Sequence, residues 1–201
     1  MADLTLQHVV LRIVAVLLIA AAHGWTLAAT GCGLGDAGPR HDGRLSANPI
    51  RHLDVLGGLL AVLFTFGWIR PIVLDRDRLG RGGLVLAVGT ASCATLGMAI
   101  ALHRVRPMLL NWLPDTGAQT FFVLVETIGQ LAVSFTLFNL LPLPPLTGQH
   151  LLQAILPGKA DLARRLSPCG TVLLALLVAS GVIGRLFAPI TAAVRSISVI
   201  G

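Results

Sequence analysis

An acidic side chain, Glu126, lies within a long apolar stretch, where it could take part in chemistry. Glu126 is the only glutamate of the chain, and Gln130 follows one helical turn later. An ionisable group inside a membrane is costly and commonly marks a functional site. Glu126 also lies near the start of its apolar stretch, from which it could reach the membrane interface. The pair is therefore a candidate intramembrane polar site, with solvation at the interface as the alternative.

The three cysteines offer a second kind of chemistry. Cys32, Cys93 and Cys169 lie far apart and form no C-x-x-C pair. An odd number at these spacings indicates neither a disulfide framework nor a zinc ribbon. We interpret all three as small apolar side chains.

The composition shows what surrounds these residues. The chain has 201 residues, of which 55% are hydrophobic and 12% charged, and its mean hydropathy is +0.83. Soluble domains carry roughly 25% charged residues. Several apolar stretches approach the ~20 residues that a helix needs to cross a bilayer. The sequence therefore predicts an integral membrane protein.

The formal net charge of +6 comes mainly from arginines between the apolar stretches. Phospholipid headgroups accept arginine side chains at such positions. No stretch interleaves basic and aromatic residues, and tyrosine is absent. The predicted partners are therefore the lipid bilayer and other membrane protein subunits, without a nucleic acid.

We expect an all-α fold, a single polytopic membrane domain over residues 1–201 with about five membrane-spanning helices. The polar, glycine-rich stretch after the first helix is long enough for a short strand or hairpin. In the third helix, Gly89, Cys93 and Gly97 recur every four residues, which predicts a face packed against other helices. The expected spans are about 9–29, 53–70, 83–102, 120–141 and 171–189.

The fourth span ends in a proline cluster. Pro142, Pro144 and Pro145 must break the helix, because proline lacks a backbone donor and clashes with a preceding carbonyl group. Non-helical backbone at membrane depth is tolerated only where protein buries it or where it lines a cavity. We therefore expect this segment to pack against other helices.

Two ordered motifs carry a resemblance to a known family. The first runs LGDAGPRHDGRLSANPIRHLDVLGGLLAVLFTFGWIRP from Leu34 to Pro71, and the second runs FNLLPLPPLTG from Phe138 to Gly148. The chain resembles the small bacterial site-2 proteases, which are intramembrane zinc peptidases. In that family LGD, GRLTLNPLRHIDPLG and GWAKP follow one another at nearly this spacing, and FNLLPIPPLDG follows later. The resemblance implies a site-2-protease-like helix bundle in a bacterial inner membrane, crossed several times.

The resemblance also implies which residues replace the catalytic ones. The family binds zinc through an H-E-x-x-H on the first helix and an aspartate after the proline cluster. Here His23 matches the first ligand, Gly24 the general base, Leu27 the second ligand and Thr147 the aspartate. A general base alone contributes about 10²–10⁴ in rate, and the metal supplies the activated water. We therefore predict a pseudo-protease that has lost its zinc site, has no cofactor and is not an enzyme.

An alternative is a metallopeptidase with a rebuilt metal site. His23, His52 and His150 are its candidate ligands. Against it, His23 can hydrogen-bond a neighbouring helix, and His52 belongs to the retained NPIRH segment. His150 occupies a position that is often basic in the family.

Two further functions follow from a retained bundle. The first is an accessory or structural subunit of a larger membrane complex. The second is a regulator that binds client transmembrane helices without cutting them. Both would use the former substrate groove to hold a helix or a lipid. The candidate groove residues are His23, Asn139, Pro142, Pro144 and Pro145.

Overall fold

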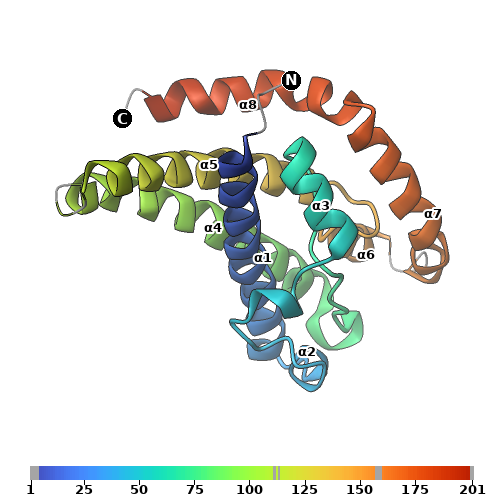
Figure 1. Ribbon diagram of the computed structural model, residues 1–201. Helices are drawn as coiled ribbons and strands as arrows, with labels where there is room; N and C mark the ends of the chain where they lie inside the picture. Colours follow the sequence, from blue (N-terminus) through green and yellow to red (C-terminus); the bar gives the residue numbers. More distant parts are fainter. Residues whose placement is uncertain (1–4, 111, 113, 157–159, 200–201) are drawn as a thin grey trace.

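The computed structural model describes residues 5–110, 112, 114–156 and 160–199, and within these residues the fold is all-α, as predicted (Figure 1). An isolated bridge between Leu53 and Ile69 is the one β-type pairing in this described part. No strand or hairpin forms in the stretch after the first helix, which instead contains two short helices. The elements are α1 (Leu6–Gly33), α2 (Gly38–His41), η1 (Pro49–Arg51), α3 (Val55–Phe64), α4 (Arg76–Leu110), α5 (Asp115–Asn139), α6 (Gln149–Ile155), α7 (Ala160–Ala179) and α8 (Val182–Val199).

Among the described residues, three helices, α1, α4 and α5, are long and apolar enough to cross a membrane. A fourth span arises if the bent pair Pro168–Ala179 and Val182–Ala193 counts as one, although its two parts meet at 67°. Gly181 lies at this bend with a φ of 76°, a conformation that glycine adopts at little cost. The stretch predicted as a single helix over 171–189 is thus two helices. The prediction of a protein that crosses the membrane several times is confirmed.

The stretch predicted as a span over 53–70 differs from a membrane-spanning helix. α3 has ten residues and ends at Thr65, whose φ of 74° is left-handed. The chain then turns back along α3, where Gly67 lies so close that an added Cβ would be 2.7 Å from Cβ of Ala61. We call residues 65–71 the return segment. Its end is tied by a hydrogen bond of 2.8 Å from the Arg70 amide to the His52 carbonyl.

The main core lies between α1, α4 and α5, and small side chains let these helices approach closely. On α1, Ala15 and Ala28 are completely buried. On α4, Ala87 and Ala91 are buried, whereas the predicted packing face of Gly89, Cys93 and Gly97 is exposed. That prediction is wrong because two faces of this helix carry small residues every four positions, and periodicity alone does not choose between them.

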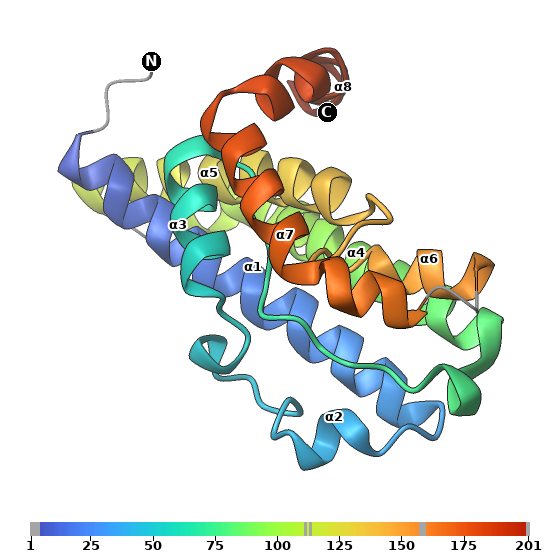
Figure 2. The same cartoon turned by 90° about the vertical axis from the view of Figure 1, so that its right-hand side faces the viewer.

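A second cluster joins the return segment and α3 to the C-terminal helices. Phe66 packs against Phe138 and Phe187, with ring centroids 5.8 and 5.7 Å apart. Val178 on α7 and Trp68 belong to the same buried cluster. Figure 2 shows α7 beside α3, with α2 and the following loop running along the second half of α1. The bundle therefore encloses the middle of α1 from several sides.

Candidate functional site

His23 lies in the middle of α1, fully buried, at the meeting point of three separate segments. Its Nδ1 is 3.0 Å from Oγ1 of Thr95 on α4, and its Nε2 is 3.1 Å from Oγ1 of Thr147. The ring meets Phe135 of α5 edge-on, at a centroid distance of 5.2 Å. The structure thus brings together His23 and Thr147, which the sequence paired only by resemblance. We call this group the His23 centre.

The hydrogen bonds determine which ring nitrogen carries the proton. The Thr95 hydroxyl donates to the Ala91 carbonyl at 2.8 Å, so its oxygen accepts from Nδ1–H of His23. A neutral imidazole then presents a lone pair at Nε2, which accepts the hydroxyl proton of Thr147. Both ring nitrogens are therefore satisfied by threonine hydroxyl groups.

The position that matches the family's general base is covered by another histidine. Gly24 faces the His52 ring, and an added Cβ at Gly24 would lie 2.6 Å from Cγ of His52. His52 is fully buried, and this burial lowers its pKa, partly offset by the Ser46 carbonyl. Nε2 donates to that carbonyl at 2.8 Å. Nδ1 is therefore an acceptor, and it has no partner in the described part of the protein.

His150 is placed apart from this centre, on α6. Its Nε2 donates to the Ile72 carbonyl at 3.0 Å, and its Nδ1 lies 3.2 Å from Oε1 of Gln153. Burial lowers the pKa of His150. The contacts tie α6 to the chain that follows the return segment, which is a structural role. Within the described ranges, no three His, Cys, Asp or Glu side chains lie close enough to hold a metal ion.

The predicted groove residues are only partly inside the bundle. Asn139 is buried at the end of α5, where Nδ2 donates to the carbonyl groups of Gly67 and Phe135 at 2.8 and 2.9 Å. Pro144 and Pro145 are buried, and α7 packs so tightly here that a Cβ on Gly170 would lie 2.9 Å from the Pro144 carbonyl oxygen. Pro142 is exposed.

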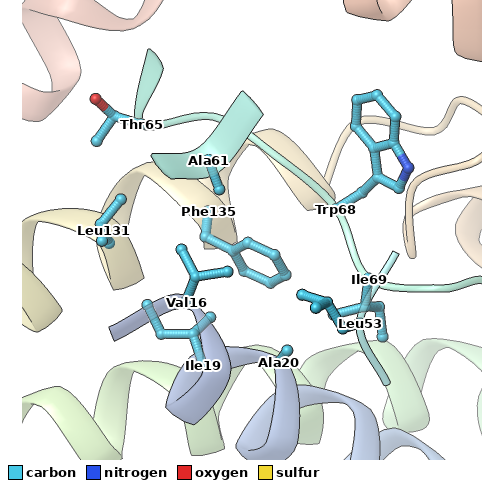
Figure 3. A pocket seen from close by; sticks show the side chains of 10 residues that line it. All are labelled: Val16, Ile19, Ala20, Leu53, Ala61, Thr65, Trp68, Ile69, Leu131 and Phe135. Atoms are coloured by element: carbon cyan, nitrogen blue, oxygen red, sulfur yellow. The ribbon is translucent and has the colours of Figure 1, made fainter. Parts of the chain in front are cut away.

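A small apolar cavity lies beside the His23 centre, between α1, α3, α5 and the return segment (Figure 3). Its volume of about 10 Å³ is close to that needed for one water molecule. Phe135 borders both this cavity and the His23 ring. The lining residues are Val16, Ile19, Ala20, Leu53, Ala61, Thr65, Trp68, Ile69, Leu131 and Phe135.

Four buried polar atoms around this region have no hydrogen-bond partner among the described residues. They include a donor, Trp68 Nε1, and an acceptor, Asn139 Oδ1. Asn139 reaches the carbonyl group of Gly67, the residue before Trp68. An unpaired polar atom in a protein interior costs about 1–3 kcal/mol. The other two atoms are Nδ1 of His52 and Oγ1 of Thr136.

The candidate polar site in α5 is built differently from the predicted pair. Glu126 accepts from Arg106 of α4 at 2.7 Å, and His103 lies 3.8 Å away. The Arg106 guanidinium also stacks over Phe122 at 4.7 Å. Gln130 is exposed. Arg106 escaped the sequence analysis because α4 continues past the predicted end at residue 102.

Thr95 is the other residue that sequence analysis missed. It is fully buried in an apolar helix, and a buried hydroxyl needs a partner. The sequence signal that could have marked Thr95 as part of a site is its hydroxyl group within an apolar stretch.

Comparison with known proteins adds one relative. The chain is 36% identical over 133 residues to the Bacillus subtilis (strain 168) protein named "Putative zinc metalloprotease YwhC". The match covers 61% of this chain and 58% of that protein. This chain is similar to a protein that is named as a zinc metalloprotease. No protein-family model matches the sequence, and no solved structure matches it either. This match agrees with the resemblance of the sequence motifs to site-2 proteases.

This relative contradicts two predictions made from the sequence. The chain was expected not to be an enzyme, whereas a 36% identical metalloprotease points to a peptidase. It was also expected to have no cofactor, whereas the name of the relative implies zinc. Both expectations were based on the substitutions at Gly24, Leu27 and Thr147. They gave less weight to the similarity of the rest of the chain.

The residues of the His23 centre do not fit a zinc ion of the usual kind. Zinc sites use thiolate, imidazole and carboxylate ligands, whereas the two partners of the His23 ring are hydroxyl groups. The Nε2 lone pair that would bind a metal already accepts from Thr147. The chemistry visible here is hydrogen bonding at a buried imidazole, with His52 Nδ1 as an unpaired acceptor nearby.

Proposed function

We propose that this chain is a polytopic membrane protein of the site-2 protease type that binds a non-helical segment of another membrane polypeptide. The binding place is the region beside the His23 centre, between α1, α5 and the return segment. The observation that carries the proposal is the pair of unpartnered buried atoms at Trp68 and Asn139.

An unwound polypeptide has the groups that these atoms lack. Each residue offers a backbone N–H and a C=O, and inside a membrane both must be satisfied. The Trp68 indole only donates, whereas Oδ1 of Asn139 only accepts. A bound backbone C=O would accept from the Trp68 indole, and a bound backbone N–H would donate to Oδ1 of Asn139. The polar groups of the protein and of the bound segment would then all have partners.

The cavity walls suit the side chains of such a segment. They are almost entirely apolar, with Thr65 as the one hydroxyl side chain. The cavity itself is too small for a polypeptide, so binding requires α3 and the return segment to separate from α1 and α5. α3 has ten residues, and the return segment after it is non-helical, so fewer helical hydrogen bonds hold this part than hold α1, α4 or α5.

The comparison supports a polypeptide as the ligand, because polypeptides are what a metalloprotease acts on. A subunit role in a larger membrane complex and a location in a bacterial inner membrane stay predictions.

Photocrosslinking tests the proposal. A photoreactive amino acid replaces Leu53, which lines the cavity, or Leu86 as a control, which is 50% exposed on α4. The probe is a biotinylated transmembrane peptide with a central Gly-Pro break, compared with an unbroken poly-Leu-Ala peptide of equal length. We expect the broken peptide to crosslink at position 53 several times more than at 86.

The outcomes separate binding from cleavage. Equal labelling at both positions, or equal labelling by both peptides, would contradict the proposal. Mass spectrometry of the recovered broken peptide then shows whether it is intact or cut at the break. Cut peptide extends the proposal to peptidase activity, and intact crosslinked peptide supports the binding step itself.

A further inference from the structure

A second, polar hollow lies outside the His23 centre, between the loop that joins α1 to α3 and the return segment. Its volume is about 370 Å³, and its lining residues are Asp42, Arg44, Arg51 and Arg70. Three guanidinium groups and one carboxylate leave an excess of two positive charges. We call this hollow the arginine pocket.

The positive charge of the arginine pocket is only partly neutralised by Asp42. In the described part of the chain, no carboxylate lies within 4.0 Å of any of its three guanidinium groups. Burial, and then the charge of Arg70, lower the pKa of Arg44. Positive groups crowded in this way favour a bound anion, because the anion removes their mutual repulsion.

The three arginines have different roles. Arg44 is buried and donates to the carbonyl groups of Arg51 and Pro71, so it holds the loop against the return segment. Arg51 and Arg70 are exposed. No hydrogen bond of either guanidinium group is seen in the described residues. Their donors are therefore available to a ligand.

We propose that the arginine pocket binds the phosphate group of an anionic phospholipid headgroup. Guanidinium groups match phosphate oxygens in geometry and charge, and they bind them by two parallel hydrogen bonds. The volume of the pocket admits a phosphate together with part of the glycerol headgroup.

The level of the pocket along α1 argues for a lipid. α3 runs antiparallel to the first half of α1, because Arg12 donates to the Val62 carbonyl at 2.8 Å while His52 lies against Gly24. Further along α1, Pro39 lies beside Gly31, and the Arg44 amide donates to the Pro39 carbonyl at 2.8 Å. From Leu6 to Gly31, α1 rises about 38 Å, which exceeds the ~30 Å of the hydrocarbon core. The loop that carries Arg44 thus lies towards the end of α1 that extends to the headgroup layer.

Exposed apolar and aromatic side chains at this level support the same placement. Trp25 follows Gly24 and is 47% exposed, as expected of a tryptophan in an interfacial belt. Ile50, next to Arg51, is 72% exposed. Leu45 follows Arg44 and is also exposed. Basic and apolar side chains exposed together are typical of a segment in contact with a membrane surface.

Lipid titration of the purified 201-residue chain tests this proposal. Native mass spectrometry from mixed detergent micelles measures binding of phosphatidylglycerol, with phosphatidylcholine as the zwitterionic comparison. The double variant Arg51→Gln/Arg70→Gln removes the two free guanidinium groups and keeps Arg44, which holds the loop. Arg81→Gln is the matched control, because Arg81 is exposed and does not line the pocket.

We expect wild type to prefer phosphatidylglycerol, and the double variant to lose roughly 30-fold in affinity, at about five- to sixfold for each arginine. The control should stay within about twofold of wild type. Equal loss in the control, or no loss in the double variant, would overturn the proposal. Unfolding temperatures of all three proteins check that the variants fold. Inorganic phosphate is the competitor: if it displaces the lipid at equal concentration, the pocket binds free phosphate and the lipid assignment is wrong.

Discussion

The imidazole of His52 fills the space beside Gly24 on α1, where an added Cβ would come within 2.6 Å of Cγ of His52. The residue that matches the family's general base and a histidine from the retained NPIRH segment are thus in direct contact. A side chain at position 24 and the observed position of His52 exclude each other.

This contact predicts that Gly24→Ala destabilises the protein although alanine favours helices. Forcing an extra carbon into a packed interior costs about 1–3 kcal/mol. The measurement is thermal unfolding in detergent. Gly89→Ala is the control, because no atom lies within 4 Å of an added Cβ there, and it should be neutral or slightly stabilising. In a double-mutant cycle, His52→Ala should remove most of the cost at position 24. An unchanged cost in that background would show that the contact is not its cause.

The hydrogen bonds of the His23 centre predict a second loss of stability. Thr147→Val keeps the shape of the side chain but leaves Nε2 of His23 without its partner, at a cost of about 1–3 kcal/mol. Thr95→Val should cost a similar amount through Nδ1. Thr120→Val is the comparison, since Thr120 is half-buried and bonds only to the carbonyl of Thr116 in its own helix. Equal unfolding temperatures for all three variants would argue against a buried network at His23.

The buried histidines outside the spans predict loss of stability in acid. Burial lowers the pKa of His52 and His150 from 6.5 in the folded protein, so the unfolded chain binds protons first. Stability is therefore full above pH 6.5 and falls as the pH drops from there towards the lowered folded values. Unfolding followed from pH 8 to pH 5 measures this slope. His150→Gln should make it shallower, and a slope unchanged by that substitution would contradict the assignment.

The ion pair between α4 and α5 predicts that Glu126 matters more than Gln130. Glu126→Gln removes the charge that Arg106 contacts at 2.7 Å, and a partly exposed pair of this kind contributes up to about 1 kcal/mol. Gln130→Ala should change stability by less than about 0.5 kcal/mol, because it is an exposed substitution. In a double-mutant cycle, Glu126→Gln and Arg106→Gln together should cost less than the sum of the two. Additive costs would mean that the two side chains do not interact.

The fold class was predictable because it depends on local properties. Apolar stretches of sufficient length and the proline cluster after Asn139 are both visible in the sequence. The return segment was not. Its direction depends on Gly67 packing against Ala61, a contact that no periodicity reveals. For the same reason, the expected span over 53–70 became a short helix followed by a chain that turns back.

The sequence by itself determined that this is an α-helical membrane protein whose motifs resemble an intramembrane peptidase, with His23 and Thr147 at matching positions. Only the tertiary structure decided that Thr95 and Thr147, 72 and 124 residues from His23, hold the two sides of its ring. It also decided that Arg44, Arg51 and Arg70 line one pocket. The physical reason is that such contacts depend on which helix faces pack together, and packing between distant segments leaves no mark in the local pattern of residues.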